Sequence, residues 1–161
     1  MKMRSEEIFQ TLKKCGLFGE LSDEELSSIA DLGSIEHFAT GDVIYRQGDI
    51  VNKLYILSEG QVSLNRNFEI GNDRQAEKIV YILRESPNRR LLGSWSTLVG
   101  EVHTQLCSAK CNKPTKVVSF NSSELRDLIS KHLNIRIKIL EKLVVILRER
   151  LESSYSSMET L

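Results

Sequence analysis

Residues 92–104, LGSWSTLVGEVHT, hold the side chains of this sequence best suited to binding a small anion. Gly93 precedes a short helix-like turn, and Gly100 and Glu101 follow it. The first backbone N–H groups of such a turn have no partner within it and can cradle a negative charge. His103 follows at the place where a cationic side chain would hold a phosphate. The stretch therefore predicts an anion-binding turn that is poor in charge.

Residues that could catalyse a reaction are scattered along the chain. His37, His103 and His132 lie far apart, and none has a nucleophile and a base at a catalytic spacing. The sequence has no phosphate-binding loop of the Lys-Ser/Thr type and no cluster with the spacing of metal ligands. We therefore expect the protein not to be an enzyme.

Composition narrows the class of protein. The 161 residues suffice for one domain with a substantial core. Basic and acidic residues balance at 22 each, which gives no general attraction to nucleic acid or to anionic membranes. No apolar run approaches the roughly 20 residues that span a bilayer, and residues 1–7 lack the apolar stretch of a secretory signal. The cysteines, Cys15, Cys107 and Cys111, are odd in number, so we expect reduced thiols in the cytoplasm.

Two short helices are predicted before residue 34. The first covers residues 5–15, where apolar residues recur at helical spacing. Ser22 and Glu25 have the spacing of a capping box that opens the second helix, and Gly33 fits its end. Both helices precede a segment of different character.

Residues 35–120 read as short strands. Apolar residues lie two apart within short segments, and glycines separate the segments, as in turns with positive φ. Strands are expected around residues 43–45, 54–56, 62–64, 79–83 and 115–120. Residues 65–77 are polar and are expected to form the mobile tip of a hairpin. Strands this short and numerous predict a barrel or sandwich.

Helical periodicity returns after residue 120. Asn121 or Ser122 can cap a helix that ends near Lys131, and a longer helix is expected over residues 133–153. The long helix has two adjoining apolar stripes. The first has heptad spacing and consists of Leu133, Ile137, Leu140, Val144, Leu147 and Leu151. The second consists of Ile135, Ile139, Leu143 and Ile146.

Two apolar stripes on one helix indicate two surfaces to cover. We expect one stripe to pack on the strands and the other, the heptad stripe, to form the interface of a homodimer, because two-fold dimers are the commonest oligomers. The alternative is that both stripes are buried within one monomer.

Three segments together resemble the cyclic nucleotide-binding domain family. They are residues 17–26, LFGELSDEEL; residues 40–49, TGDVIYRQGD; and residues 54–62, LYILSEGQV. The likeness extends over about residues 12–150. It implies an α+β fold, mainly β, in which an antiparallel, jelly-roll-like β-roll lies between N-terminal helices and a C-terminal pair that includes the long helix. Residues 1–161 would form one domain, with N-terminal helices at about 5–33, the β-roll at about 35–120 and C-terminal helices at about 122–153.

The resemblance also shows where this sequence departs from the family. The family's phosphate-binding cassette reads Phe-Gly-Glu, a helical turn, and then Pro-Arg-Ser/Thr-Ala. Gly93 and Thr104 keep the family's residue types. Ser94 stands where the family's Glu binds a ribose hydroxyl, His103 stands where its Arg clasps the cyclic phosphate, and Gln105 replaces the small alanine. The frame is kept and both polar anchors are changed.

The two lost anchors are expected to weaken cyclic nucleotide binding. Arginine meets a phosphate with two parallel, charge-assisted hydrogen bonds, whereas histidine donates in one direction at a time and is only partly charged near neutral pH. One charge-assisted bond contributes about 1.5–3 kcal/mol, or roughly 10- to 150-fold in affinity. The amides of residues 94–96 would remain as a weak anion cradle. We therefore expect weak or absent cAMP and cGMP binding and no cofactor.

Several of these residues have a second interpretation. Trp95 could stack on a base, but the family places a packing residue there, which favours core filling. His103 could contact a phosphate or simply occupy a vacated polar site. His103, Cys107 and Cys111 recur every four residues and would share a helix face, but residues 104–109 lie where the family has a strand. A strand sets them about 13 Å apart at each step, so no metal is expected.

The sequence thus predicts a non-catalytic signalling module that acts through protein contacts. Its partners would be a second copy of the chain, bound through the C-terminal helix, and possible protein targets. The alternative is a true receptor for a cyclic mono- or dinucleotide with an altered cassette. The candidate contacts for any ligand are Gly93, Ser94, Trp95, Ser96, His103 and Thr104.

DNA binding and membrane binding are not expected. Family regulators carry a helix-turn-helix module after the long helix. Only about ten residues follow Leu151 here, and they offer no recognition helix.

Overall fold

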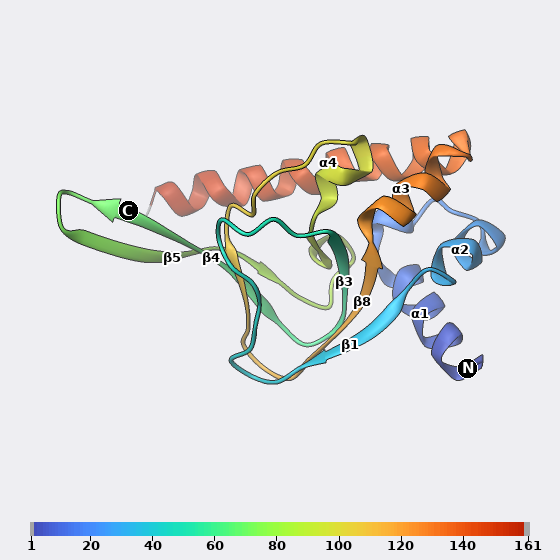
Figure 1. Ribbon diagram of the computed structural model, residues 1–161, viewed down its shortest axis with the longest axis horizontal. Coiled ribbons are helices and arrows are strands. Elements are labelled where there is room, and N and C mark those ends of the chain that lie inside the picture. The colour runs from blue at the N-terminus through green and yellow to red at the C-terminus, as the bar shows by residue number, and fades with distance from the viewer. Residues whose placement is uncertain (1, 160–161) are drawn as a thin grey trace.

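Two four-stranded antiparallel sheets form the centre of the molecule (Figure 1). The computed structural model describes residues 2–159, with side chains from residue 4 onward. The first sheet has the strand order β1-β8-β3-β6 and the second β2-β7-β4-β5. The strands are β1 (Ser34–Phe38), β2 (Val43–Tyr45), β3 (Lys53–Glu59), β4 (Val62–Ile70), β5 (Arg74–Leu83), β6 (Leu91–Gly93), β7 (Ser108–Cys111) and β8 (Thr115–Asn121). This arrangement confirms the antiparallel roll.

Helices cover one end of the roll and one of its sides. Three short helices gather at one end, and the fourth runs the length of the molecule above the strands (Figure 1). The helices are α1 (Lys2–Lys14), α2 (Asp23–Ala30), α3 (Ser122–Ser130) and α4 (Leu133–Met158), with 3-10 turns η1 (Gly16–Phe18), η2 (Pro87–Arg89) and η3 (Trp95–Val99). The mixed α+β class is confirmed, although helices hold more residues than strands because α4 is 26 residues long. In the described part of the chain, no helix is long and apolar enough to cross a bilayer.

The helix ends follow their sequence signals. At the start of α2, the Ser22 hydroxyl accepts from the Glu25 N–H at 3.2 Å, and the Glu25 carboxylate accepts from the Ser22 N–H at 2.9 Å. At the start of α3, the Asn121 side chain accepts from the N–H groups of Ser123 and Glu124. Both caps satisfy backbone donors that a helix leaves unpaired at its first turn.

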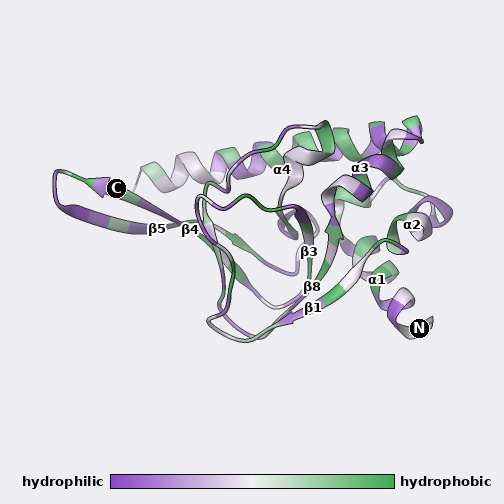
Figure 2. Cartoon of the chain, viewed as in Figure 1, coloured by the Kyte–Doolittle hydropathy of each residue, from purple (hydrophilic) through white to green (hydrophobic). Residues whose placement is uncertain are grey.

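The two apolar stripes of α4 have different fates. Ile135, Ile139, Leu143 and Ile146 are buried in one core cluster with α1, α2, α3 and the first sheet. Of the heptad stripe, Leu140 and Leu147 pack against this cluster, whereas Leu133, Ile137, Val144 and Leu151 are exposed. Hydrophobic and hydrophilic residues accordingly interleave along α4 in Figure 2. The stripe expected to pack on the domain does so.

Residues 65–77 do belong to a hairpin, but they are paired strands and not an irregular tip. β4 continues to Ile70 and β5 begins at Arg74, so only residues 71–73 form the turn. The backbone ladder pairs the two strands from Val62 with Leu83 out to the turn. The polar composition fits the position of this hairpin, which projects beyond the roll (Figure 1) and whose residues 69–75 are all exposed. A polar sequence can therefore form strands when it has no core to face.

Two boundaries also differ from expectation. α4 ends at Met158 rather than near residue 153. The expected strand over residues 104–109 begins only at Ser108, because the preceding residues pair with a loop. Gln105 donates its N–H to Asp49 O at 2.8 Å and accepts from the Gly48 N–H at 2.7 Å. Loop-to-loop pairing thus replaces the start of the strand.

Candidate functional site

A cavity of about 280 Å³ lies between the second sheet and the C-terminal half of α4. Tyr45, Leu64 and Tyr81 reach it from β2, β4 and β5, Gly93 from the end of β6, and Arg150 from α4. Its volume is at the small end of the range for ligand sites, about 300–1,000 Å³. The cavity therefore suits a compact ligand.

A larger hollow of about 400 Å³ lies where α2 meets the start of α4, and it is a weaker candidate. Its polar lining is already engaged, because the Glu25 carboxylate accepts from the Ser22 N–H and from the Lys138 ammonium at 3.0 Å. A ligand there would have to compete with bonds that stabilise the fold. The lining of the cavity under α4, by contrast, includes side-chain donors without a partner.

The turn after β6 depends on the glycine that opens it. Gly93 has φ +97°, and a Cβ at this position would lie 2.5 Å from the carbonyl oxygen of Lys53 on β3. Only glycine adopts this conformation without strain and without a clash. The next residue, Ser94, is 2% exposed, and its hydroxyl bonds to the Thr97 hydroxyl at 2.7 Å. The side chain at the family's ribose-binding position is thus bonded within the turn.

His103 is also held by the turn. Its Nδ1 hydrogen-bonds to the Ser96 hydroxyl, which donates to the carbonyl of Glu101 at 2.7 Å. A hydroxyl has one hydrogen, so Ser96 must accept from His103, and Nδ1 carries the proton. Only Nε2 of the ring is left for another partner. The Trp95 and His103 rings lie 5.3 Å apart at 42°, which further fixes the imidazole.

Arg150 brings an unsatisfied charge to the opposite wall of the cavity. Its guanidinium lies over the Tyr81 ring, 5.0 Å from the ring centroid. Its Nε and Nη2 atoms are buried and have no hydrogen-bond partner. Burial lowers the pKa of Arg150, while Tyr81 and Tyr45 act against that shift. The ring face attracts the cation, and Nε and Nη2 remain without an acceptor.

Burial shifts the pKa of two further groups in the lining. It raises the pKa of the Tyr45 hydroxyl to about 12, and it also raises the pKa of the Cys107 thiol. Both groups are therefore neutral near pH 7. Cys15, Cys107 and Cys111 are all free thiols. Within residues 2–159, no group of three His, Cys, Asp or Glu side chains is placed to hold a metal ion.

Comparison with known proteins identifies the fold. The family profile described as "cyclic nucleotide-binding domain" matches residues 35–132, more than half of the chain. The chain belongs to this family. The cGMP-dependent protein kinase egl-4 of Caenorhabditis briggsae is 28% identical to this cyclic nucleotide-binding domain over 76 residues, 47% of this chain and 10% of the kinase. The mouse cGMP-dependent protein kinase 2 is 31% identical over 71 residues, 44% of this chain and 9% of the kinase. The chain thus spans about a tenth of these kinases.

Solved structures agree on the fold. A cyclic nucleotide-binding domain from Methylobacillus flagellatus superposes with a TM-score of 0.74 at 20% identity, covering 94% of this chain and 80% of that one. The regulatory subunit of a cAMP-independent protein kinase A from Trypanosoma cruzi, bound to guanosine, superposes at 0.65 and 22% identity, covering 87% and 46%. Identities this low establish the architecture alone.

The six predicted ligand contacts, all within the described residues, divide into two groups. Gly93, Trp95 and His103 line the cavity. The hydroxyls of Ser94 and Ser96 are buried in the hydrogen bonds of the turn, and Thr104 is exposed, where its backbone bridges to Ile50. Trp95 packs against the main core cluster while forming part of the cavity wall, so packing and a ligand-facing surface coexist.

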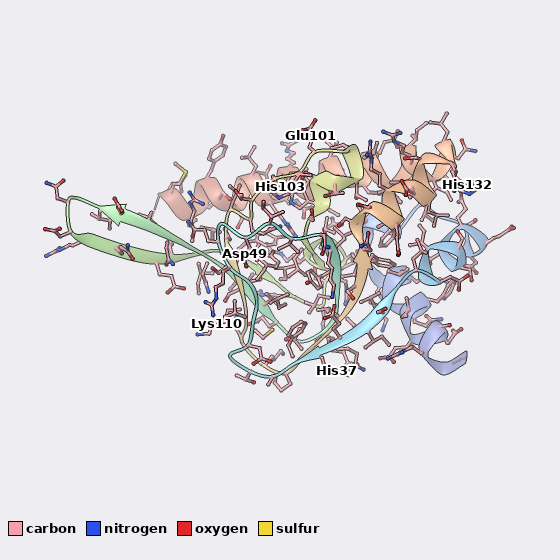
Figure 3. The ribbon with its side chains drawn as sticks, in the orientation of Figure 1. His37, Asp49, Glu101, His103, Lys110 and His132 are labelled. Carbon is pink, nitrogen blue, oxygen red and sulfur yellow. The ribbon has the colours of Figure 1, made fainter. Side chains whose placement is uncertain are left out.

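The histidines do not gather into one site. Figure 3 shows His103 beneath α4, His37 at the opposite edge of the roll and His132 near the start of α4. No pair of them can share a reaction centre.

Arg150 and Gln105 were not among the predicted contacts. A signal for Arg150 was present, because it follows Ile146 by four residues and so continues the buried stripe of α4. A charge at the next position of an apolar stripe indicates a side chain directed at the interior. Gln105 was noted only as bulk beside the phosphate position. It is 6% exposed and lines the cavity.

Proposed function

We propose that this domain is a non-catalytic regulatory module that has lost tight cAMP and cGMP recognition and acts through protein contacts of α4. The bonding within the turn after Gly93 carries this proposal. Ser94 is tied to Thr97, and His103 is tied to Ser96, so the two anchor positions hold neither the charges of the family nor free side chains. A cyclic phosphate would meet backbone amides and one imidazole nitrogen.

A ligand other than a cyclic nucleotide is compatible with this fold. The Trypanosoma cruzi regulatory subunit is described as cAMP-independent and bound to guanosine. That protein supports the view that a domain of this architecture can regulate without cAMP. The same interpretation is proposed for the present chain, together with a cytoplasmic location in keeping with its free thiols.

The exposed face of α4 supports a homodimer as the form in which the module acts. Ile137, Val144, Leu151 and Met158 are exposed and recur every seven residues. We call these four residues the α4 seam. A contiguous exposed apolar line on a helix indicates a protein interface, and a seven-residue repeat is typical of helix pairing. Leu151 also lines the cavity, so a partner on the seam would border it.

Calorimetric titration with cAMP, cGMP and cyclic dinucleotides tests the loss of recognition. We expect dissociation constants above about 100 μM, because two charge-assisted contacts worth about 10- to 150-fold each are missing. Micromolar binding of any of these ligands would replace the proposal with the receptor alternative, in which His103 and the turn amides hold the phosphate.

A double variant, Ser94→Glu with His103→Arg, should restore at least about 10-fold in cAMP or cGMP affinity if the frame of the cassette is intact. The matched control is Ser123→Glu with His37→Arg, which makes the same charge changes at exposed positions outside the cavity lining. Equal affinity for the two double variants would show that the anchors are not what limits binding.

A further inference from the structure

The side chain of Arg150 presents an empty hydrogen-bonding fork to the cavity. Nε and Nη2, the two atoms without a partner, are the pair whose N–H bonds lie parallel on one edge of a guanidinium. This edge matches the two oxygens of a carboxylate or phosphate. The Tyr81 ring lies beneath the guanidinium, and both nitrogens of that edge remain without a partner.

Gln105 adds a second unsatisfied donor. Its Nε2 is buried without a partner, and its backbone is fixed by hydrogen bonds to Gly48 and Asp49. Among residues 4–159, five buried side-chain nitrogen or oxygen atoms lack a partner, and three of them belong to Arg150 and Gln105. Both residues line the cavity, and all three atoms are donors. Three of the five unsatisfied atoms therefore belong to this lining, and these three can only donate.

The rest of the lining is apolar or aromatic. Tyr45, Tyr81 and Trp95 contribute rings, and Leu64 and Leu147 contribute aliphatic surface. The described lining residues include no Asp or Glu that could neutralise Arg150. A buried cation without a counter-ion is unfavourable, and an anion that enters with its own apolar body would relieve it.

We propose that the cavity under α4 binds a small aromatic oxyanion, with its charged group on the Arg150 fork and the Gln105 amide and its ring against the aromatic wall. The shared chemistry is a flat apolar body with a carboxylate or a phosphate monoester. The charge is then held by α4 and not by the turn after Gly93. Because Arg150 and Leu151 are adjacent, such a ligand would act directly on the helix that carries the seam.

The test uses the indole N–H signal of Trp95, the single tryptophan of the chain, in NMR titrations of the whole protein. The probes are 2-naphthoate, 2-naphthyl phosphate and the neutral 2-naphthamide. For ligands of this size we expect dissociation constants in the micromolar to millimolar range. At least one anion should shift the Trp95 signal and bind at least about 10-fold more tightly than the amide. The relative affinities of the two anions distinguish a carboxylate from a phosphate site.

Variants assign the effect to the fork. Arg150→Met should weaken binding of the anion at least about 10-fold, and Arg150→Lys, which keeps the charge without the fork, should fall between Arg150→Met and the natural chain. Arg148→Met is the control, because Arg148 is exposed on the same helix and pairs with Glu152. If Arg150→Met does not fold, Arg150→Lys provides the comparison of anion affinity with the natural chain.

Three results would overturn the inference: equal binding of the anions and the amide, unchanged anion affinity in Arg150→Met, or no shift of Trp95 with either anion. The inference is independent of the proposed loss of cAMP and cGMP recognition. Tight cAMP binding would contradict the proposed loss of recognition. The naphthoate titration would still test the site at Arg150.

Discussion

The two polar walls of the cavity contrast in how their groups are satisfied. In the turn after Gly93, the hydroxyls of Ser94 and Ser96 and one nitrogen of His103 bond to neighbours three to seven residues away. On α4, the fork of Arg150 has no partner. The wall that resembles the family's binding cassette is thus closed upon itself, and the wall that does not resemble it is open to a ligand.

The difference follows from chain geometry. A turn brings short polar side chains near one another and near its own backbone, so their bonds form locally. A side chain at position 150 is placed by the register of a long helix, and only elements distant in sequence could provide its partner. Here those elements present aromatic rings. Similarity of a motif therefore does not decide where a cavity retains its capacity to bind charge.

The largest expected effect compares two arginines. Arg90 is buried, and its Nη1 donates to the carbonyls of Leu57 and Ser58 at 2.9 and 3.0 Å. Arg90→Met should lower the free energy of unfolding by about 3–5 kcal/mol, because two carbonyls lose charge-assisted bonds. Arg150→Met should stay within about 1 kcal/mol of the natural chain, since it removes an unpaired buried cation and gains an apolar contact. Although Nε of Arg90 also lacks a partner, its Nη1 is bonded, whereas Nε and Nη2 of Arg150 are both unpaired. Denaturant unfolding of both variants measures the difference, and equal losses would contradict this contrast.

The next effect concerns the backbone of the cassette wall. Gly93→Ala should destabilise the domain by about 3 kcal/mol, because the new Cβ meets the Lys53 carbonyl in a left-handed conformation. Gly71→Ala is the matched control, with φ +69° and nothing within 4 Å of the added carbon, and should cost only about 1 kcal/mol. Thermal unfolding compares the pair. Similar losses would mean that the turn can move away from β3 and is not a rigid wall.

The smallest expected effect concerns the exposed face of α4, the helix that carries Arg150. Val144 lies on the seam and is 67% exposed, while its neighbour Val145 is 46% exposed and is rotated by about 100° around the helix. Val144→Glu should weaken self-association at least about 10-fold, because it places a charge in the helix pair, whereas Val145→Glu should change it little. Sedimentation equilibrium of the two variants decides this. Equal dissociation of both, or a natural chain that is monomeric at high concentration, would remove the dimer from the proposed function.

Much of the fold could be predicted because its signals are local. The capping box of Ser22 and Glu25, the cap at Asn121 and the buried stripe through Ile139 all depend on residues within one or two helical turns. The strands of residues 65–77 could not be predicted in this way. Their polar sequence lacks the alternation of a half-buried strand, because the hairpin extends past the core that would impose it.

The site was predicted in part for a related reason. The resemblance singled out Gly93 and His103, and both line the cavity. It could not show that Thr104 would be exposed, because this depends on a bridge to Ile50 more than fifty residues earlier. The position of Arg150 in the helix indicated that its side chain points inward. Nothing in the sequence indicated that its Nε and Nη2 would lack a partner.

The amino-acid sequence was enough to determine the order of helices and strands, the capped helix ends, the glycine turns between strands and the periodicity of both α4 stripes. These depend on local backbone preferences and on spacing along a single element. The tertiary structure alone decided which polar groups find partners: Ser94 and His103 within their turn, Nη1 of Arg90 on two carbonyls, and Nε and Nη2 of Arg150 on none. Hydrogen bonds and burial between distant elements exist only once those elements have packed, so the unfilled fork under α4 is a property of the fold and not of any segment of the chain.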